Sequence, residues 1–323
     1  MCTAISVTSG DNYFGRNLDY EHSFGEKICI TPRNYCFNFL NGVSLKNHYA
    51  IIGMALPVSN YPLYFDASNE KGLSIAGLNF PGNACYNKNL NNKENIASFE
   101  FIPWVLCQCN SVWSAKELIS NSNITDTAFN DKLSPTPLHW LVSDKFQSIT
   151  VEQTKSGMKI YDNPAGVLTN NPTFNIQLFN LNNYMSLSIY PPQNSFSKSL
   201  NLGCYSRGMG AIGLPGDFSS SSRFIKAAFV KLNSIFGKTE EQKVNNFFHI
   251  LYSVYQYNGC VMVENGCEYT QYTSCCNTNK GIYYYTTYNN TNINAVDMHR
   301  ENLNSYELII YELNKNCNIK FEN

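Results

Sequence analysis

The second residue of the chain is a cysteine, Cys2, and it follows a methionine that cells routinely remove. Once Met1 is gone, Cys2 carries a thiol and a free α-amine on the same residue. An α-amine has a pKa near ~7.7 to 8.0, so an appreciable neutral fraction is present at physiological pH to act as a base. One residue then supplies both a nucleophile and its base. The pattern predicts nucleophilic catalysis by Cys2, with removal of Met1 as the activating step.

Two strand-like segments follow that can position Cys2. "TAISVTS" and "NYFGRNLDY" flank Gly10 and Asp11, and a two-residue loop that begins with glycine is typical of a β-hairpin. With that loop, Cys2 lies opposite Asp19. A carboxylate there can hold the α-amine by a charge-assisted hydrogen bond.

Arg16 is a second candidate partner of the thiol. A guanidinium beside the sulfur would favour the thiolate. Strict alternation, however, pairs Arg16 with Ile5 on the other face of this hairpin, so a bulge or a different register is needed to bring it to Cys2. The alternative interpretation of Arg16 and Asp19 is an ordinary exposed ion pair.

Composition limits the class of protein. The 323 residues are 43% hydrophobic and 15% charged, with 22 Tyr and 20 Phe, which favours strands around a large core. The formal net charge is −1 without a run of Lys or Arg, which argues against a nucleic-acid partner. We find neither a signal-peptide pattern nor a stretch of about 18 apolar residues, so we expect no membrane partner and a cytoplasmic location.

The expected elements alternate between strands and helices. Strand-like runs include "AISVTS", "YAIIGMAL", "GLSIAGLNF", "LHWLVSD", "SITVEQT", "GIYYYTTY" and "YELIIYEL". Helices are expected within residues 98–120 (two of them, the second from near Ser111), at 222–236 and at 239–257, which opens with a T-E-E-Q capping box. With no linker between them, these elements predict one domain over residues 1–323, with packed sheets and helices on the outer faces.

Other motifs are weaker. The twelve cysteines include no C-x-x-C, and the histidines form no metal-binding pattern, so we expect reduced thiols and no metal. Gly208, Gly210 and Gly213 form a G-x-G-x-x-G, but they run into "LPGDF" rather than into a helix, which favours a turning loop over a nucleotide site.

A set of short motifs resembles the choloylglycine hydrolase family, which includes bile salt hydrolases and penicillin V acylases. They occur in the family's order and spacing: "MCT", "FGRNLDYEHSF", "NEKGLSIAGLNFP", "LHWLVSD", "VEQT", "GVLTNNPTF", "GLPGDFSSSSRF" and "TQYTSC" with "KGIYYYTTY". The resemblance implies an α+β fold, the four-layer αββα sandwich of N-terminal nucleophile hydrolases, and commonly a homotetramer. It implies no metal or cofactor.

The same resemblance implies roles for six residues. The nucleophile falls on Cys2, the arginine near the sulfur on Arg16 and the amine-holding aspartate on Asp19; the further site residues fall on Asn79, Asn170 and Arg223. An asparagine NH2 and a backbone N–H are suitable donors for the oxyanion that forms when a thiolate attacks an amide. Of the two asparagines in "TNNP", Asn170 directly follows the threonine of the motif.

Asparagine at position 79 favours bile salts, because penicillin V acylases tend to have tyrosine there. We therefore expect hydrolysis of glycine- or taurine-conjugated bile salts, whose apolar steroid needs an apolar groove. The candidate lining residues lie in the neighbouring loop segments, where core packing is the alternative interpretation: Leu18, Tyr20, Phe24, Val58, Phe65, Phe129 and Leu133. Penicillin V or an N-acyl homoserine lactone is an alternative substrate. A cysteine-rich redox or binding protein, with Cys2 incidental, is an alternative class.

Overall fold

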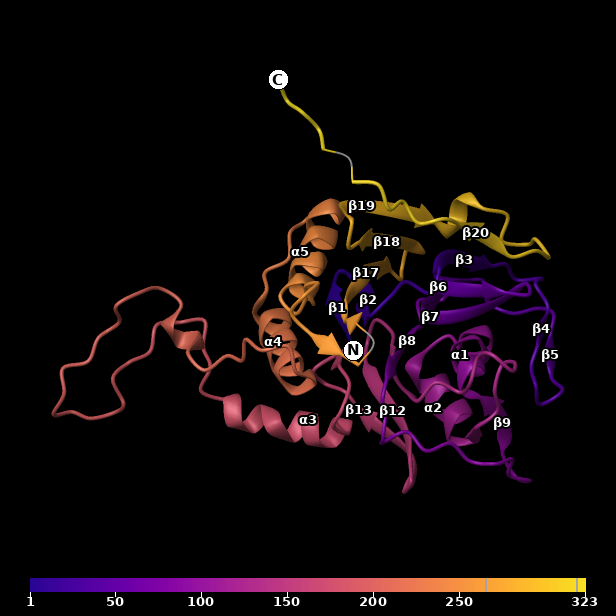
Figure 1. Cartoon of the computed structure of the whole chain (residues 1–323), viewed down its shortest axis with the longest axis horizontal. Helices are drawn as coiled ribbons and strands as arrows, with labels where there is room; N and C mark the ends of the chain where they lie inside the picture. Colours follow the sequence, from indigo (N-terminus) through magenta and orange to yellow (C-terminus); the bar gives the residue numbers. More distant parts are fainter. Residues whose placement is uncertain (265, 318) are drawn as a thin grey trace.

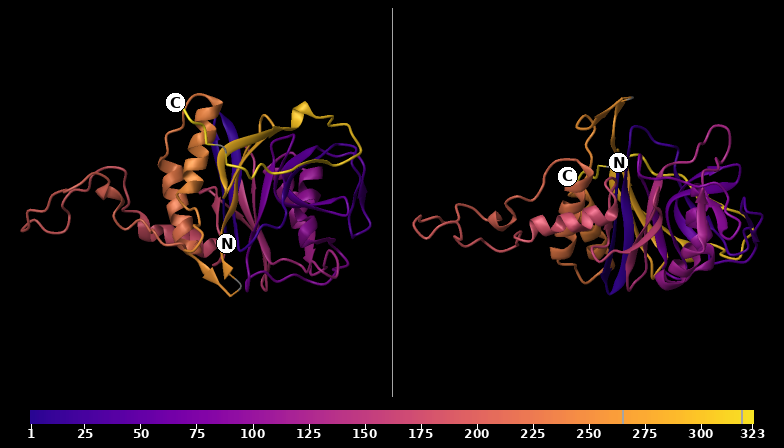
Figure 2. Two further views of the ribbon diagram at one scale, coloured as in Figure 1. Left: turned by 45° about the horizontal axis from the view of Figure 1, so that its top comes forward. Right: turned by 90° about the horizontal axis from the view of Figure 1, so that it is seen from below.

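Two antiparallel sheets lie face to face, and helices cover the outer face of each. The computed structural model describes residues 1–264, 266–317 and 319–323. In Figure 1 and in the left view of Figure 2, the orange helices α4 and α5 lie on one side of the sheets and the magenta helices α1 and α2 on the other. This is the αββα sandwich that the sequence predicted.

The first sheet has six strands and contains the N-terminus. Its order is β14 (Val167–Leu168), β1 (Cys2–Ser9), β2 (Asp11–Tyr20), β17 (Tyr269–Asn277), β18 (Ile282–Thr287) and β19 (Asn290–Asp297). The second sheet has eight strands in the order β13 (Gly157–Asp162), β12 (Ser148–Thr154), β11 (Leu138–Ser143), β8 (Ser74–Asn79), β7 (Tyr61–Asn69), β6 (Ile51–Val58), β3 (Lys27–Thr31) and β20 (Ile309–Tyr311). Three small two-stranded sheets pair β4 (Phe37–Asn38) with β5 (Ser44–Leu45), β9 (Glu94–Ala97) with β10 (Ser122–Thr125), and β15 (Met262–Val263) with β16 (Gly266–Cys267).

Five α-helices accompany the sheets over the described residues: α1 (Phe101–Gln108), α2 (Val112–Ser120), α3 (Phe174–Asn180), α4 (Ser220–Asn233) and α5 (Glu240–Tyr252). Local capping explains where α2 and α5 begin. The hydroxyl of Ser111 accepts from the backbone N–H of Ser114, and Thr239 forms the expected capping box with Gln242. The sequence did not predict the short helix α3.

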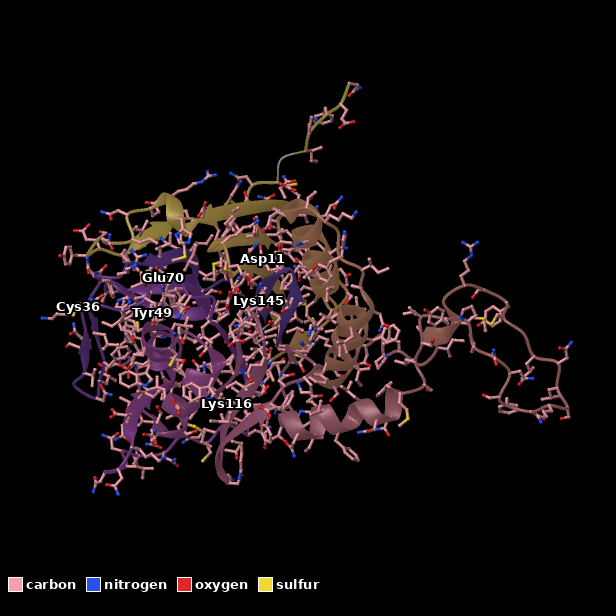
Figure 3. All side chains as sticks on the ribbon, turned by 180° about the vertical axis from the view of Figure 1, so that it is seen from behind. Asp11, Cys36, Tyr49, Glu70, Lys116 and Lys145 are labelled. Atoms are coloured by element: carbon pink, nitrogen blue, oxygen red, sulfur yellow. The ribbon has the colours of Figure 1, made fainter. Side chains whose placement is uncertain are left out.

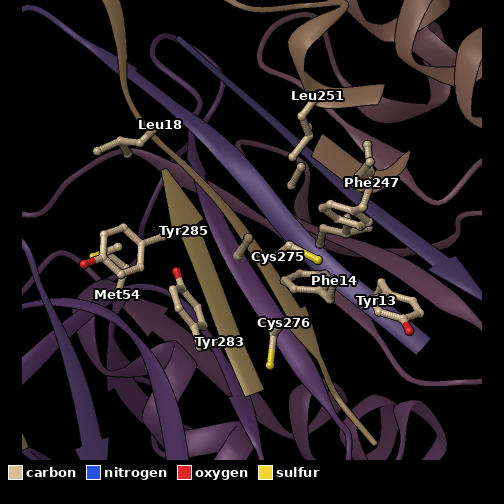
Figure 4. Close-up of a cluster of buried hydrophobic side chains, with 14 of the residues drawn as sticks. Tyr13, Phe14, Leu18, Met54, Phe247, Leu251, Cys275, Cys276, Tyr283 and Tyr285 are labelled. Atoms are coloured by element: carbon tan, nitrogen blue, oxygen red, sulfur yellow. The ribbon is translucent and has the colours of Figure 1, made fainter. Parts of the chain in front are cut away.

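The core lies in the layers between these elements. Figure 4 shows part of it, with Phe247 and Leu251 reaching in from α5 and Met54 from the second sheet. On the other side of the second sheet, Trp140 stacks on Phe101 of α1 with 4.2 Å between ring centroids. Sheet residues therefore alternate between the inter-sheet layer and a helical layer.

The register of the first hairpin differs by one residue from the prediction. The strands turn at Gly10, whose φ is +77°, and Cys2 pairs with Leu18 rather than with Asp19. The predicted two-residue loop of Gly10 and Asp11 is wrong, because Asp11 already pairs with Ser9. Because a slip of one residue moves every side chain to the opposite face, Arg16 now pairs with Ala4 and lies on the same face as Cys2. This is the different register that Arg16 needed.

A long loop between α3 and α4 extends away from the body of the protein in every view (Figures 1 and 2). It contains the G-x-G-x-x-G glycines, and Gly208 and Gly213 have φ values of +80° and +96°. The only regular structure near them is a single 3-10 turn at Met209–Ala211 among the described residues. These glycines therefore belong to a turning loop, as expected.

Candidate active site

Cys2 lies at the start of β1, with only 4% of its surface exposed. In a strand, side chains two residues apart share a face, so the thiol is on the face of β1 that carries Ala4 and Ser6. Ser6 receives a hydrogen bond from Ser143 of the second sheet, at 2.6 Å, so this face looks into the layer between the sheets. The thiol therefore lies at the end of the inter-sheet layer.

Arg16 projects from β2 into the same layer and is 1% exposed. Its Nη1 donates to the carbonyl oxygens of Gly77, at 2.5 Å, and Phe65, at 3.1 Å. Its Nη2 is buried without a hydrogen-bond partner among the described residues. Burial opposes the charge, but the nearby Cys2, Tyr272 and Asp66 outweigh it and raise the pKa of Arg16. The guanidinium is a fixed cation whose Nη2 has both N–H groups unpaired among the described residues.

Asp66 provides a buried carboxylate behind Arg16. Its oxygens accept from the hydroxyls of Tyr272 and Tyr283, both at 2.6 Å, and from Ser274 at 3.1 Å. Ser274 also accepts from the backbone N–H of Arg16 at 3.1 Å. Burial raises the pKa of Asp66, while Arg16 and these hydrogen bonds oppose that effect. The network links Arg16 to both sheets, and the sequence analysis did not predict it.

The backbone nitrogen of Cys2 points to a different set of groups. It donates to Oδ1 of Asn170 at 2.8 Å. The same oxygen accepts from Nη2 of Arg223 at 2.8 Å. Nη1 of Arg223 donates to the carbonyl of Cys2, at 2.5 Å, and to the hydroxyl of Thr3, at 2.7 Å. Arg223 is 1% exposed, and burial lowers its pKa, against the opposing effects of Asp19 and Cys2. Arg223 is therefore a buried site residue and not a surface charge.

Asp19 lies next to the N-terminus, although it is not paired with Cys2. Its backbone N–H donates to the carbonyl of Met1 at 3.0 Å, and its Oδ1 accepts from Thr270 at 2.7 Å. Its Oδ2 is buried and has no hydrogen-bond partner among the described residues. Burial raises the pKa of Asp19, and Arg223 and the N-terminal amine oppose the rise. One carboxylate oxygen thus remains available to a nearby donor.

Met1 occupies the space beside this carboxylate. Its amine donates to the carbonyl of Asp19 at 2.8 Å and forms an ion pair with Glu268. Burial lowers the pKa of this amine, and Cys2 and Asp19 work in the opposite direction. The form of the chain that retains Met1 therefore has its amine one residue away from the thiol.

Asn79 ends β8 and is half-buried. Its carbonyl accepts from Nδ2 of Asn170 at 2.7 Å. Within the described part of the chain its own side-chain amide makes no hydrogen bond, so both of its N–H groups are available. Asn170 uses one amide hydrogen on Asn79 and keeps the other.

The residues predicted to line an apolar groove fall into two groups in the structure. Leu18 pairs with Cys2, and the rings of Tyr20, Phe24 and Phe65 follow one another with centroid distances of 4.6 and 5.5 Å. The second group surrounds Tyr61: Val58 pairs with it, Phe129 is 5.7 Å from it between centroids, and Leu133 accepts from the backbone of Phe129 at 3.1 Å. Two polar cavities of about 400 and 560 Å³ lie elsewhere in the chain.

Comparison with known proteins identifies the family of the chain. The family model of linear amide C-N hydrolases, choloylglycine hydrolase family, matches residues 2–311. The chain belongs to the choloylglycine hydrolase family. A bile salt hydrolase/transferase from Lactiplantibacillus plantarum is 55% identical over 314 residues, which cover 97% of each chain. A bile salt hydrolase/transferase from Clostridium perfringens is 42% identical over the whole of both chains.

Solved structures confirm the fold of this choloylglycine hydrolase family member. A crystal structure of a variant of conjugated bile acid hydrolase from Clostridium perfringens has a TM-score of 0.92 at 41% identity and covers all of both chains. Penicillin V acylase from Agrobacterium tumefaciens has a TM-score of 0.75 at 19% identity, with 97% of this chain and 91% of that chain covered, and it supports the fold alone. The protein is a linear-amide C-N hydrolase by family, and Cys2 at its N-terminus fits the nucleophile.

Proposed function

We propose that this protein hydrolyses the amide bond of glycine- or taurine-conjugated bile salts, through a thioester on Cys2 that forms after Met1 is removed. The observation that carries the proposal is that the nitrogen of Cys2 is bonded to Asn170 while its thiol lies on the face that carries Arg16. Relatives that are 55% and 42% identical are named bile salt hydrolase/transferase, which supports this substrate class.

The first half of the reaction breaks the amide. The thiol of Cys2 gives its proton to the α-amine, and the thiolate attacks the amide carbonyl carbon. The oxyanion that forms accepts from the free N–H groups of Asn79, with the second amide hydrogen of Asn170 as a further donor; one such donor is worth about 3 kcal/mol in comparable sites. The α-ammonium then protonates the leaving amine of glycine or taurine as the C–N bond breaks.

The second half releases the bile acid. The neutral α-amine takes a proton from water, and the hydroxide attacks the thioester carbon. Collapse of the second oxyanion breaks the C–S bond, and the sulfur recovers its proton from the amine. Arg16 stabilises the thiolate, and Asp19 holds the amine through its free Oδ2. Arg223 fixes the backbone of Cys2 and Asn170.

We assign the steroid to the apolar residues around Cys2. The part of the steroid next to the amide is assigned to Leu18, which pairs with Cys2, and to the connected rings of Tyr20, Phe24 and Phe65. We assign the far end of the steroid to the second group, Val58, Phe129 and Leu133, which gathers around Tyr61. Apolar walls with a few polar groups at one end suit a steroid with an anionic amide tail.

A side-by-side release assay tests this function. Glycocholate, taurocholate and penicillin V are offered to the protein, whose N-terminus is established by intact mass. We expect faster cleavage of the bile salts, no turnover by Cys2→Ser or by chains that retain Met1, and normal turnover by Cys204→Ser, which changes an exposed loop cysteine. Faster release from penicillin V would favour the acylase alternative. Unchanged turnover in Cys2→Ser would overturn the mechanism and favour a role in which Cys2 is incidental.

Transfer to an amine is a second candidate activity, because the two relatives above carry the name hydrolase/transferase. A thioester is an electrophile for an amine as well as for water. Incubation of glycocholate with excess free taurine tests this directly: formation of taurocholate, followed by mass spectrometry, supports transfer, and formation of cholate alone excludes it under those conditions.

We also propose that the protein is a homotetramer in which partner subunits cover the long loop between α3 and α4. This loop extends from the body in Figure 3, and its apolar side chains are unusually exposed: Met185 80%, Tyr190 71%, Phe196 82% and Tyr205 85%. Light scattering after size exclusion should give four subunits, and fewer for the double variant Phe196→Ser, Tyr205→Ser. Phe146→Ser, which changes an exposed ring outside this loop, is the control and should remain a tetramer.

The proposed location is the cytoplasm. All twelve cysteines are free thiols, which is typical of a reducing compartment. Fractionation of the source cells tests this, with activity expected in the cytosolic fraction.

A further inference from the structure

A buried histidine and a buried glutamate lie side by side behind the proposed site. His139 is on β11 and Glu152 is on the neighbouring strand β12, and each is 0% exposed. Their side chains meet with 3.1 Å between Nδ1 and Oε1. The ring of His139 also stacks on Phe80, with 4.1 Å between centroids and 7° between planes. Neither residue has a part in the reaction described above.

This pair binds both ends of one short segment. Nε2 of His139 lies 2.8 Å from the carbonyl oxygen of Thr169, and Oε1 of Glu152 accepts from the backbone N–H of Phe174 at 2.9 Å. The segment between these two contacts contains Asn170. The carbonyl of Thr169 and the backbone nitrogen of Asn170 belong to the same peptide group, so a shift of one moves the other.

The contacts require a proton within the pair. A carbonyl oxygen can only accept, so Nε2 of His139 must carry a hydrogen to bond Thr169. Nδ1 and Oε1 of Glu152 then need a second hydrogen between them. A glutamine at position 152 does not reproduce this arrangement with a neutral imidazole. With the hydrogen on Nε2, the glutamine oxygen would face an Nδ1 that has no hydrogen to donate, and an NH2 group placed there could not accept from Phe174.

We propose that His139 and Glu152 are positioning residues for Asn170, which in turn holds the nitrogen of Cys2. The inference rests on the proposed function, because it assigns the pair to catalysis through the site described there. The path has three hydrogen-bonded steps: His139 to the carbonyl of Thr169, Oδ1 of Asn170 to the nitrogen of Cys2, and Nδ2 of Asn170 to the carbonyl of Asn79. If Asn170 moved, it would lose its hydrogen bond to the nitrogen of Cys2. It would also lose its bond to the backbone of Asn79, the residue assigned to bind the oxyanion.

Three variants test the pair. His139→Phe keeps a ring that can stack on Phe80 but removes both hydrogen bonds; His139→Gln keeps an N–H that can reach Thr169; Glu152→Gln disturbs the shared proton. We expect kcat to fall roughly 100-fold in His139→Phe and about 10-fold in the other two, with KM within about twofold of wild type. Recovery of kcat in His139→Gln relative to His139→Phe identifies the bond to Thr169 as the important one.

The chain offers a matched control in a second buried histidine. His48 is 6% exposed, contacts the ring of Phe37, and has both ring nitrogens 2.8 Å from backbone carbonyls, those of Tyr49 and Tyr35. His48→Phe should lower the melting temperature as His139→Phe does but leave kcat unchanged. An equal loss of kcat in the two variants would mean that the effect is loss of stability alone, and would overturn the proposal.

A double-mutant cycle with Asn170 gives a second criterion. If the pair acts through Asn170, His139→Phe should change the residual single-turnover rate less than twofold in an Asn170→Ala background. If His139→Phe lowers the rate in the Asn170→Ala background as much as it does in the wild type, the proposal is overturned. Should His139→Phe fail to fold, Glu152→Gln completes the same cycle.

A substrate-free readout separates this proposal from the proposed function. The alkylation rate of Cys2 by iodoacetamide, followed on its N-terminal peptide in the protein without Met1, should change at least about fivefold in His139→Phe and not in His48→Phe. If the protein does not cleave bile salts but this change occurs, the positioning role stands and the substrate assignment fails. If bile salts are cleaved but neither kcat nor alkylation responds, the positioning role fails alone.

Discussion

Oδ1 of Asn170 accepts a hydrogen bond from the backbone nitrogen of Cys2 at 2.8 Å, across 168 residues of sequence. In the chain that retains Met1 this nitrogen belongs to an amide. After removal of Met1 the same atom is the α-amine, and Asn170 is already in place to accept from it. We therefore expect processing to change the chemistry of the nitrogen more than its position, and the groups around it should set its basicity.

Asp19 should control the pH dependence of the reaction. Burial lowers the pKa of the Met1 amine, and the carboxylate of Asp19 raises it. We expect the same carboxylate to raise the pKa of the Cys2 α-amine once Met1 is removed, so Asp19→Asn should lower that pKa. Because the base acts in its neutral form, the acid limb of the kcat/KM profile should move to lower pH, by roughly one unit. The maximum should also fall, since the carboxylate no longer holds the amine.

Asp11→Asn is the control for this prediction. Asp11 lies at the opposite end of the same hairpin, where it accepts from Asn277 at 3.0 Å. Its variant should keep the wild-type profile. A profile of Asp19→Asn that moves to higher pH, or does not move, would show that Asp19 does not interact with the catalytic base.

Arg16 should matter for stability as well as for activity. Arg16→Gln removes the bonds to Gly77 and Phe65 and leaves Asp66 without its nearby cation. We expect about 100-fold lower kcat and a loss of about 3 kcal/mol in the free energy of unfolding at pH 7. Arg33→Gln is the control: it breaks an ion pair in which Arg33 is 36% exposed, and Glu70 keeps its bond from the backbone N–H of Ala50, so the variant should lose clearly less stability than Arg16→Gln.

The loss in Arg16→Gln should also depend on pH in one direction. Arg16 opposes the effect of burial on the pKa of Asp66, so its removal raises that pKa further. In the variant, Asp66 of the folded chain takes up its proton at a higher pH than Asp66 of the unfolded chain, whose pKa is the ordinary 3.8. This uptake stabilises the folded variant as the pH falls. The destabilisation should therefore shrink from pH 7 to pH 4, as measured by urea unfolding. A loss that is constant with pH would contradict this role of Arg16.

The hairpin shows what the sequence could and could not predict. Residue type pointed to Cys2, turn counting pointed to Asp19, and the family resemblance assigned a role to Arg16. Strand-like runs, helix signals and the family motifs together predicted the sheets and the outer helices. Turn chemistry at Gly10 could not fix the register, because loops that differ by one residue fit the same glycine. The slip of one residue exchanges the faces of Arg16 and Asp19, so their positions required the structure.

Hydrogen-bond networks between side chains on distant strands could not be predicted from the sequence, for a different reason. His139 and Glu152 lie within the quoted motifs "LHWLVSD" and "VEQT", but nothing in either motif indicates that they meet at Thr169. Asp66 likewise gives no local signal of its partners on β17 and β18. Such contacts depend on how the two sheets are stacked, which periodicity does not specify.

Lys231 should make stability rise with pH. Its amine donates to the carbonyl of Ala165 at 2.5 Å, and burial lowers its pKa to about 8 from 10.5. The unfolded chain therefore binds more protons between about pH 8 and 10.5, so this lysine destabilises the folded state most below pH 8. Lys231→Met should be more stable than wild type by about 2 kcal/mol at pH 7, with the difference shrinking toward pH 10.

Urea unfolding at several pH values measures this difference. Lys145→Met, which changes an exposed lysine lining the same cavity, should show no such trend. If the difference in unfolding free energy between Lys231→Met and wild type grows with pH, the buried amine of Lys231 is not the cause of the difference.

Gly15 should be intolerant of a side chain because two strands approach closely there. A Cβ at this position of β2 would overlap the carbonyl oxygen of Ser274 on β17 and lie 2.9 Å from the Cα of Cys275. Gly15→Ala must therefore push the strands apart, which should cost about 3 kcal/mol of unfolding free energy. It should also lower kcat, because Ser274 accepts from the backbone N–H of Arg16.

Gly203→Ala is the matched substitution for comparison. A Cβ on Gly203, in the long loop, would meet no heavy atom within 4 Å among the described residues, apart from its two chain neighbours, so stability should stay within about 0.5 kcal/mol of wild type. Urea midpoints and kcat for the two variants test the prediction together. If Gly15→Ala loses stability but keeps full kcat, β2 and β17 can separate without moving Arg16, and the link from Ser274 to the active site would be refuted.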